Sequence, residues 1–591
     1  MKRFLTILAT LLLSGAAAQA GDISVATARK IAAATLGTDN LTLESEGSEF
    51  YIFNASGGGF AIISGTEALD PVLAYSPDGR FGTGDDAPEA LRAWMSEGRT
   101  AVRAIRKNAV QPTAEQKSKW DRATRRTSGT SNLLSTATWG QGTPCNNLCP
   151  VDDVNGGERS CVGCAALAMS IIAHYHRHPS NATGTVGGYT SEKNGFTTDI
   201  PLVDLSTISY DYDHMLSTYK NVSYTAEQAA AVATLCYSVA VTLNMQFSAK
   251  ASSTTTVDNI GYFVQDFDFD QGYLRYDKNY LTDTEWTEVL ETEIDAERPV
   301  LVTGYVASGG GHAFVVDGYD SSDRMHVNWG WDGSSNGYYD INAFRSYTKN
   351  LAAYTNLKPN EGGSASGRLY MKAGGDYSGL QFLSGNMYKD STFTVSLGRL
   401  YNYSSVAFTP QISFQLCSAD GTIKKQLSYF TAKEFTTDSK AYPSISLKLG
   451  KSTTLNRGDY IQVFYRCTSS DEWEPVYYDL DPDSGVQGKL YPNPGDYASM
   501  EYDKGTGYLT VTFIPGEWSY CTLKNSSGES VGVKTYDKTN GIIVINTAGK
   551  PAGTYTLTLY HGGYEDTGGT KHIIGYGQSA EIQFTIAGTG E

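Results

Sequence analysis

The stretch Ser160–Tyr175, SCVGCAALAMSIIAHY, constrains the fold more than any other part of the chain. The residues after Cys164 favour helix, so the sequence predicts a helix that begins at this cysteine. Gly163 permits a tight turn into that helix. A thiol at a helix N-terminus faces unpaired N–H groups and the positive end of the dipole, which favours the reactive thiolate. Cys164 is therefore a candidate nucleophile, although a single cysteine is more often a small buried residue.

The N-terminus has the pattern of a secretory signal peptide. Two cationic residues precede the apolar run Phe4–Leu13, and the small residues of Ala18-Gln19-Ala20 follow as a cleavage site, so we expect residues 1–20 to be removed. The apolar run is too short to span a bilayer, and the sequence contains no other candidate span. We expect a secreted or cell-surface protein, with the periplasm as an alternative.

Length and charge limit the remaining possibilities. A chain of 591 residues is too long for one hydrophobic core, and three or four domains are expected. The net charge of −17 argues against a nucleic-acid partner.

Residues 21–130 are predicted to form a small α+β domain followed by a cleavable linker. The predicted elements are a helix over Ala26–Leu36, a hairpin of Phe50–Phe53 and Phe60–Ser64, and a charged helix over Ala87–Val110. The stretch Gln111–Thr130 is basic, polar and poor in apolar residues. This composition indicates an exposed linker where proteolysis concentrates, and the arrangement suggests a propeptide.

The rest of the chain divides into a compact middle and an all-β tail. Residues 131–362 contain a second predicted helix at Thr225–Leu243 and become rich in strands from Pro299 onward. Residues 363–591 show short alternating runs separated by Gly, Asn and Asp turns. This spacing predicts two β-sandwich domains, 363–490 and 491–591.

A second candidate functional stretch lies at residues 309–331. A glycine-rich approach and an alternating strand are followed by a turn-like segment and another strand. A regular antiparallel hairpin centred at Asp320 would put His312 directly opposite Asn328, with both side chains on one face. We therefore expect Asn328 to orient the His312 ring, and Trp329 to shield their hydrogen bond from water.

These residues supply the parts of a cysteine-based acyl transfer. A thiolate needs a base or an imidazolium partner, and the base needs an orienting group. Cys164, His312 and Asn328 provide them in chain order. Formation of a thioester also needs donors for the developing oxyanion, and the backbone N–H of Cys164 and the side-chain amide of Gln141 are candidates. His312 alone would read as a core histidine and Gln141 as a loop residue.

The same motifs resemble the streptopain family of secreted cysteine peptidases. The resemblance is carried by Trp139-Gly140-Gln141, Val162-Gly163-Cys164, Gly310–Gly318 and His326–Trp331. It covers residues 130–350, and residues 21–108 resemble the family's inhibitory prodomain. It implies a papain-like peptidase domain behind a small α+β prodomain. The two all-β sandwich (Ig-like) domains predicted from the spacing of the tail lie beyond the minimal family enzyme, and the expected fold class of the chain is α+β. It also implies a zymogen that favours an apolar residue at the second position before the scissile bond.

The resemblance assigns roles to individual residues. It implies that Cys164 is the nucleophile, His312 the base and Gln141 an oxyanion donor, with Asn328 and Trp329 supporting the histidine.

The other cysteines admit two interpretations. Cys145, Cys149, Cys161 and Cys164 have a spacing that a zinc site could use. In an exported chain, a disulfide between Cys149 and Cys161 with Cys145 free is the favoured alternative.

Two further groups suggest metal ligands but have ordinary explanations. His174, His176 and His178 precede a proline at the end of the predicted helix, where cationic residues are common partners of the helix dipole. The acidic repeats 266–270 and 479–483 lack the glycine and glutamate of an EF-hand. We therefore expect no metal and no cofactor.

The sequence thus predicts a secreted cysteine endopeptidase, made as a zymogen, that acts on proteins or peptides and is inhibited by its own prodomain. One alternative is a papain-like transglutaminase or amidase that uses the same residues. The other is a non-catalytic surface adhesin, in which the β domains contact glycans or a surface through their aromatic residues.

Overall fold

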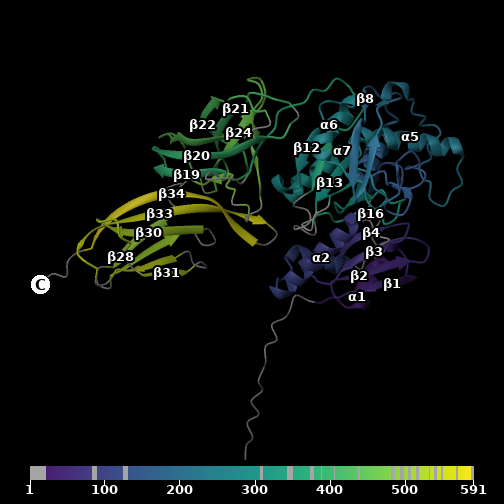
Figure 1. Ribbon diagram of the computed structural model, residues 1–591. Helices are drawn as coiled ribbons and strands as arrows, with labels where there is room; N and C mark the ends of the chain where they lie inside the picture. The colour runs from purple at the N-terminus through teal and green to yellow at the C-terminus, as the bar shows by residue number, and fades with distance from the viewer. Residues whose placement is uncertain are drawn as a thin grey trace, which may run out of the picture. The chain divides into compact units, whose positions relative to one another are not determined.

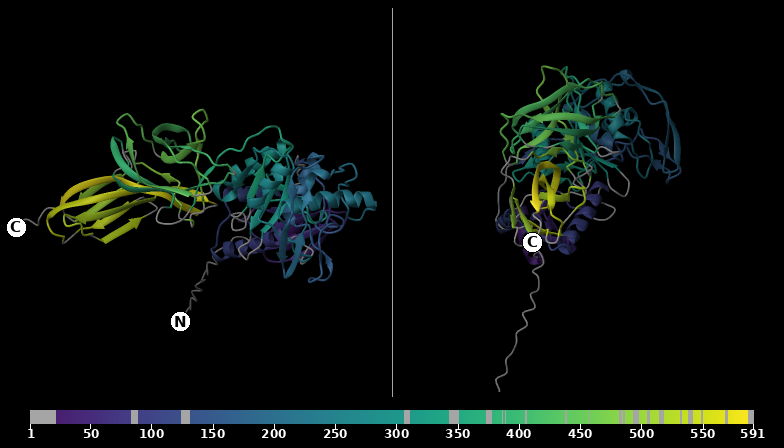
Figure 2. Two further views of the ribbon diagram at one scale, coloured as in Figure 1. Left: turned by 45° about the horizontal axis from the view of Figure 1, so that its top comes forward. Right: turned by 90° about the vertical axis from the view of Figure 1, so that its left-hand side faces the viewer.

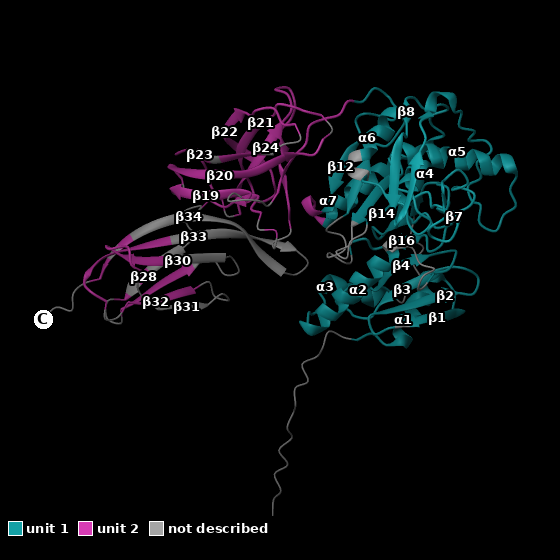
Figure 3. Ribbon diagram, viewed as in Figure 1, with its two compact units in different colours: residues 1–278, 283–363 teal, residues 279–282, 364–591 magenta. Residues whose placement is uncertain are grey.

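The computed structural model describes most of the 591-residue chain and divides it into two compact units. The described residues are 22–82, 89–123, 131–305, 311–342, 351–372, 378–385, 387, 389–404, 406–436, 439–456, 458–480, 484, 486–492, 498–503, 507–513, 518–530, 533–537, 542–547, 550–567 and 570–586. One unit contains residues 1–278 and 283–363, and the other contains 279–282 and 364–591 (Figure 3). The predicted signal peptide and the break near Pro494 lie outside the described residues. No helix within the described part is long and apolar enough to cross a membrane.

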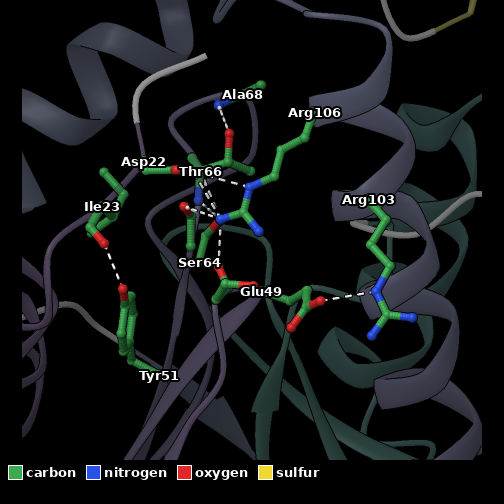
Figure 4. A network of polar contacts seen from close by, with 11 residues as sticks. Asp22, Ile23, Glu49, Tyr51, Ser64, Thr66, Ala68, Arg103 and Arg106 are labelled. Carbon is green, nitrogen blue, oxygen red and sulfur yellow. Dashed lines mark hydrogen bonds and ion pairs between the residues drawn. The ribbon is translucent and has the colours of Figure 1, made fainter. Parts of the chain in front are cut away.

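The N-terminal part of the first unit is an antiparallel sheet covered by helices (Figure 1). Its elements are α1 (Val25–Leu36), β1 (Leu41–Glu46), β2 (Phe50–Ala55), β3 (Phe60–Ser64), β4 (Val72–Ser76), α2 (Glu89–Lys107) and α3 (Ala114–Ala123). The predicted hairpin is confirmed, with Phe50 paired to Ser64. Figure 4 shows how α2 is tied to this sheet: Arg103 binds Glu49 at 2.9 Å, and Arg106 binds Asp22 at 2.9 Å.

Half of the predicted linker is a packed helix. Trp120 of α3 is buried, and its indole N–H donates a 2.8 Å hydrogen bond to the Leu69 carbonyl. Lys119 forms an ion pair with Asp70 at 2.8 Å. Most residues of α3 are exposed, as expected of the linker, but one large apolar side chain docks this otherwise polar helix. Residues 124–130 lie outside the described part of the chain.

The middle part is built on a sheet that continues the N-terminal one. The strand order is β1-β2-β3-β4-β16-β15-β14-β13-β17-β12, with β5 paired to β14. The strands of the middle part are β5 (Ser131–Leu133), β12 (Leu274–Asp277), β13 (Val300–Tyr305), β14 (Gly311–Asp320), β15 (Met325–Asn328), β16 (Gly337–Tyr339) and β17 (Ala352–Thr355). The two parts join where β4 pairs with β16, at Tyr75–Tyr338 and Ala74–Tyr339. The N-terminal part is therefore docked by backbone hydrogen bonds.

Helices and short hairpins complete the middle part. The helices are α4 (Cys164–His176), α5 (Ala226–Thr242), α6 (Thr256–Asp266) and α7 (Asp283–Asp295), and the paired short strands are β6 (Val151–Asp152) with β7 (Glu158–Arg159), β8 (Thr185–Val186) with β11 (Val203–Asp204), and β9 (Tyr189–Lys193) with β10 (Phe196–Ile200). The predicted second helix is confirmed as α5, whose start is capped by Thr225 and Gln228. Helix α4 lies in a core shared with α5 and β14.

The described residues of 364–591 are all-β, as predicted, and both views of Figure 2 show their strands. The first set of strands comprises β18 (Leu369–Met371), β19 (Leu380–Gly385), β20 (Ser391–Asn402), β21 (Gln411–Cys417), β22 (Ile423–Thr431), β23 (Ser439–Leu449), β24 (Tyr460–Arg466), β25 (Glu474–Pro475), β26 (Tyr477–Tyr478) and β27 (Lys489–Leu490). They form two sheets that share one core, to which Phe393 contributes from one sheet and Phe414 from the other. This sharing is the packing expected of a sandwich.

The last strands form two further sheets. They are β28 (Ala498–Asp503), β29 (Tyr508–Phe513), β30 (Trp518–Asn525), β31 (Val533–Asp537), β32 (Ile542–Asn546), β33 (Gly553–Thr567) and β34 (Thr570–Ile586), arranged as β28-β29-β32-β31 and β30-β33-β34. Each sheet has a buried face, represented by Val511 and Leu557. The boundary between the two predicted tail domains stays a prediction.

Candidate active site

The thiol of Cys164 stands at the first position of α4, as the sequence predicted. Gly163 is the residue before the helix and has φ 92° and ψ 137°, a conformation that is strained for any residue with a side chain. A Cβ at Gly163 would also lie 2.6 Å from the sulfur of Met245. Position 163 therefore requires glycine for two reasons: its backbone angles and the close approach of Met245.

His312 comes from the sheet and lies in the same pocket as Cys164. It lies at the start of β14, beside Gly304 of β13, and the next residue, Ala313, donates its backbone N–H to the Cys164 sulfur at 3.4 Å. Cys164 and His312 line one pocket of about 90 Å³. Its other walls are Ala165, Met245, Ser252, Ser253, Thr254, Thr303, Gly304, Gly311 and Ala313. The two halves of the predicted chemistry thus meet at one pocket.

Gln141 lies on a loop held against the segment that leads to Cys164. Its backbone carbonyl accepts a 3.1 Å hydrogen bond from the N–H of Val162, and the preceding Gly140 bridges to Trp331. The N–H of Cys164 belongs to the first turn of α4, whose donors have no acceptor within the helix. The fold therefore brings the backbone of Gln141 to the segment that leads into α4, and the role of its side-chain amide stays a prediction.

The predicted pairing of His312 with Asn328 is wrong. β14 and β15 form the expected hairpin, but Asn328 lies opposite Val315, and a bulge interrupts the ladder between Val316 and Gly318. Because side chains alternate along a strand, His312 points to the face opposite to Asn328.

The side chain of Asn328 is engaged elsewhere. Its amide nitrogen donates to the Thr136 hydroxyl at 3.1 Å and to the Ala137 carbonyl at 2.9 Å. Its oxygen accepts from the N–H of Gly330 at 3.2 Å and from Asn336 at 3.1 Å. Asn328 therefore fastens the turn after β15 to the segment that precedes Trp139.

Trp329 lies on the same face as His312. Its ring packs against Phe314 with centroids 5.0 Å apart, and its indole N–H donates to the Ser335 carbonyl at 3.1 Å. Phe314 is two residues from His312 on β14, so it shares the face of the histidine. Trp329 thus supports the strand that carries the predicted base.

Cys149 and Cys161 are both free thiols, so the predicted disulfide between them is not formed. Cys145 and Cys149 are buried in the core around α4. A hydrogen bond to Cys236, together with burial, raises the pKa of Cys145, and burial raises the pKa of Cys149. The described residues contain no group of metal-ligating side chains, which gives the zinc interpretation no support.

Two of the three histidines, His174 and His176, are not the cationic dipole partners that the sequence suggested. Burial lowers the pKa of both His174 and His176 to about 4, so they are neutral near pH 7. The His174 ring packs against Trp139 with centroids 4.7 Å apart. His178 hydrogen-bonds the Asp268 carbonyl at 2.9 Å. His174 therefore contributes to packing at the end of α4, and His178 bonds to the backbone of a distant segment.

Two family models match parts of the chain. Residues 139–339 match the model of the Peptidase C10 family. The middle part of this chain is a C10 peptidase domain. Residues 20–102 match the family described as Spi protease inhibitor, so the peptidase domain follows an inhibitor-type prodomain. The chain therefore contains a cysteine peptidase domain similar to streptopain, and the predicted fold class and enzyme class are confirmed.

The chain is also similar to individual proteins. Streptopain of Streptococcus pyogenes is 28% identical over 319 residues, which cover 51% of this chain and 76% of streptopain. The thiol protease/hemagglutinin PrtT of Porphyromonas gingivalis is 27% identical over 310 residues, which cover 51% of this chain and 34% of PrtT. Among solved structures, prointerpain A of Prevotella intermedia aligns with a TM-score of 0.43 and 23% identity, over 54% of this chain and 98% of that one.

Sequence reasoning missed one wall of the pocket. Met245 and Ser252–Thr254 follow α5 in a loop without a recognisable motif. The only sequence feature that pointed to them was Gly163, because a glycine before the nucleophile leaves room for a neighbour.

Proposed function

We propose that the protein is a secreted cysteine endopeptidase whose Cys164 attacks the scissile carbonyl with His312 as its base. The observation that carries the proposal is the common pocket of Cys164 and His312, in which the thiol stands at the positive end of α4. The thiolate forms a thioester with the acyl half of the substrate, His312 protonates the leaving amine, and water then hydrolyses the thioester.

Three further residues have supporting roles in this proposal. The side chain of Gln141 and the backbone N–H of Cys164 donate to the oxyanion during both steps. Asn328 and Trp329 hold the strand and turn around His312, and the hydrogen bonds of Asn328 support this structural role.

We further propose that the prodomain inhibits the enzyme until the chain is cut between α3 and β5. Backbone pairing of β4 with β16 supports this docking, as does the hydrogen bond of 3.1 Å from the Tyr75 hydroxyl to Asp320. Trp94 of α2 adds an edge-to-face contact with Tyr339. The close packing of α3 on the N-terminal sheet favours a cut after Ala123. A glycan or surface contact of the β domains also stays a prediction.

The test follows the intact mass of the secreted chain with time, as wild type and as Cys164→Ala. We expect only the wild type to lose its N-terminal part, with the break between residues 123 and 131, and only the wild type to hydrolyse casein. Turnover of a glutamine amide without peptide-bond hydrolysis would instead favour the transglutaminase or amidase alternative. Casein hydrolysis by purified Cys164→Ala would exclude Cys164 as the nucleophile.

A further inference from the structure

We propose that Asp152 is a positioning residue, whose buried carboxylate holds the segment 247–254, one wall of the substrate pocket, against the segment that leads to Cys164. The inference deepens the proposed function and rests on it, because the pocket must bind a peptide for the wall to matter.

The carboxylate of Asp152 joins two parts of the chain that are far apart in sequence. Asp152 is fully buried at the end of β6. One oxygen accepts from the N–H groups of Val154 at 3.2 Å and Asn155 at 2.9 Å, which closes the turn of its own hairpin. The other oxygen accepts from the Ser248 hydroxyl at 3.1 Å and the Ala249 N–H at 2.8 Å. The Asn155 side-chain amide donates to both oxygens.

The segment that Asp152 holds is also bonded to Cys161, three residues before the nucleophile. The Cys161 N–H donates to the Ser248 carbonyl at 3.1 Å, and its thiol donates to the Ala249 carbonyl at 3.3 Å. The Ser252 hydroxyl donates to the Cys161 carbonyl at 2.7 Å. The hairpin of Asp152, the segment 248–252 and the approach to Cys164 therefore form one closed set of hydrogen bonds.

This set of hydrogen bonds includes residues that line the pocket. Ser252, Ser253 and Thr254 line it together with His312. The nucleophile is also held by α4, which is buried along most of its length. Loss of the Asp152 contacts should therefore displace the wall that a substrate binds and leave the reacting thiol in place.

The chemistry of the site requires a carboxylate. Burial acts to raise the pKa of Asp152, but hydrogen bonds from the Ala249 N–H and from Asn155 outweigh it and lower the pKa, so the group is ionised at neutral pH. An asparagine has one acceptor oxygen, and its NH₂ group would face donors that the carboxylate accepts. Asp152→Asn therefore keeps the shape of the side chain but loses hydrogen bonds that the carboxylate accepts.

The experiment compares Asp152→Asn with Asp153→Asn in the full-length protein after maturation. Asp153 is the exposed neighbour and serves as the matched control. We expect Asp152→Asn to raise KM for a peptide substrate about tenfold, with kcat within about twofold of wild type. Alkylation of Cys164 by iodoacetamide, which does not use the wall, should keep its wild-type rate. Asp153→Asn should match wild type in all three measurements.

A second variant covers the case in which Asp152→Asn does not fold. Ser248→Ala removes one donor to Asp152 and leaves the Ala249 N–H, so KM should rise by a smaller factor with kcat unchanged. The inference is overturned if either variant lowers kcat at constant KM, slows alkylation, or has wild-type kinetics. A wild-type enzyme that cleaves no peptide would overturn the proposed function instead, which keeps the two failures distinct.

Discussion

Asn328 lies opposite Val315, and a single bulged residue explains why. On the turn side of the hairpin, Tyr319 pairs with Met325 and Gly318 with His326. Continued regularly, this register would place Asn328 opposite residue 316, on the face of His312. The bulge at Asp317 inserts one residue, and a shift of one residue moves a side chain to the other face of the sheet.

This register makes a prediction for Asn328→Ala. The buried amide of Asn328 makes four hydrogen bonds to groups other than the histidine ring, so its loss should lower the free energy of unfolding by about 1–3 kcal/mol. The pH dependence of kcat/KM should keep its wild-type midpoints. Denaturant unfolding and a pH–rate profile measure the two effects. A displaced midpoint would restore the role of Asn328 as the group that orients His312.

Gly163→Ala should lower both stability and activity. The backbone angles of Gly163 are unfavourable for alanine by about 1–3 kcal/mol, and the new methyl group would meet Met245. Both effects act on the residue before the nucleophile, so kcat/KM should fall with the melting temperature. The double variant with Met245→Ala relieves the contact but not the backbone strain, and it should recover only part of the loss. Full recovery would show that the backbone angles are unimportant.

Gln141→Ala tests the oxyanion donor. If the side-chain amide stabilises the tetrahedral intermediate, kcat should fall on the order of a hundredfold, with little change in KM. Thr143→Ala on the exposed part of the same loop is the control and should retain activity. Wild-type kcat in Gln141→Ala would remove Gln141 from the site.

The buried histidines of α4 predict how stability depends on pH. His174 and His176 have pKa values of about 4 in the folded protein, and near 6.5 once unfolded. Unfolding therefore takes up protons below pH 6.5, so their contribution to stability is complete above pH 6.5 and is lost as the pH falls toward 4. In a Cys164→Ala background, which prevents autolysis, the double variant His174→Asn/His176→Asn should show a shallower loss of stability between pH 7 and 5.

The unsubstituted histidines in the same Cys164→Ala background provide the reference for this measurement. An equal slope in the wild type and the double variant would mean that the two buried histidines do not govern acid unfolding.

Thiol reactivity should separate Cys164 from the other described cysteines. Burial raises the pKa of Cys149 and Cys161, and a hydrogen bond to Cys236 with burial raises that of Cys145, so these groups stay protonated at neutral pH. One equivalent of iodoacetamide at pH 7 should label Cys164 first, as read by peptide mapping. Cys164→Ala should take up little label in the same time. Faster labelling of the partly exposed Cys161 would contradict the assignment.

The sequence by itself determined the features that depend on neighbouring residues. A glycine and a cysteine before a run of helix formers predict a thiol at a helix N-terminus, and α4 begins at Cys164. Hydrophobic periodicity over Thr225–Leu243 and the alternating runs of the tail predict α5 and the β sheets. These outcomes depend on local propensity and patterning, which act within a few residues along the chain.

Tertiary structure decided what depends on distant residues. The bulge at Asp317 reverses the face of Asn328, and Trp120 folds half of a polar linker onto the N-terminal sheet. Burial keeps His174 and His176 neutral. Register, burial and pKa are set by groups brought together from far along the chain, so the pattern around one residue cannot specify them.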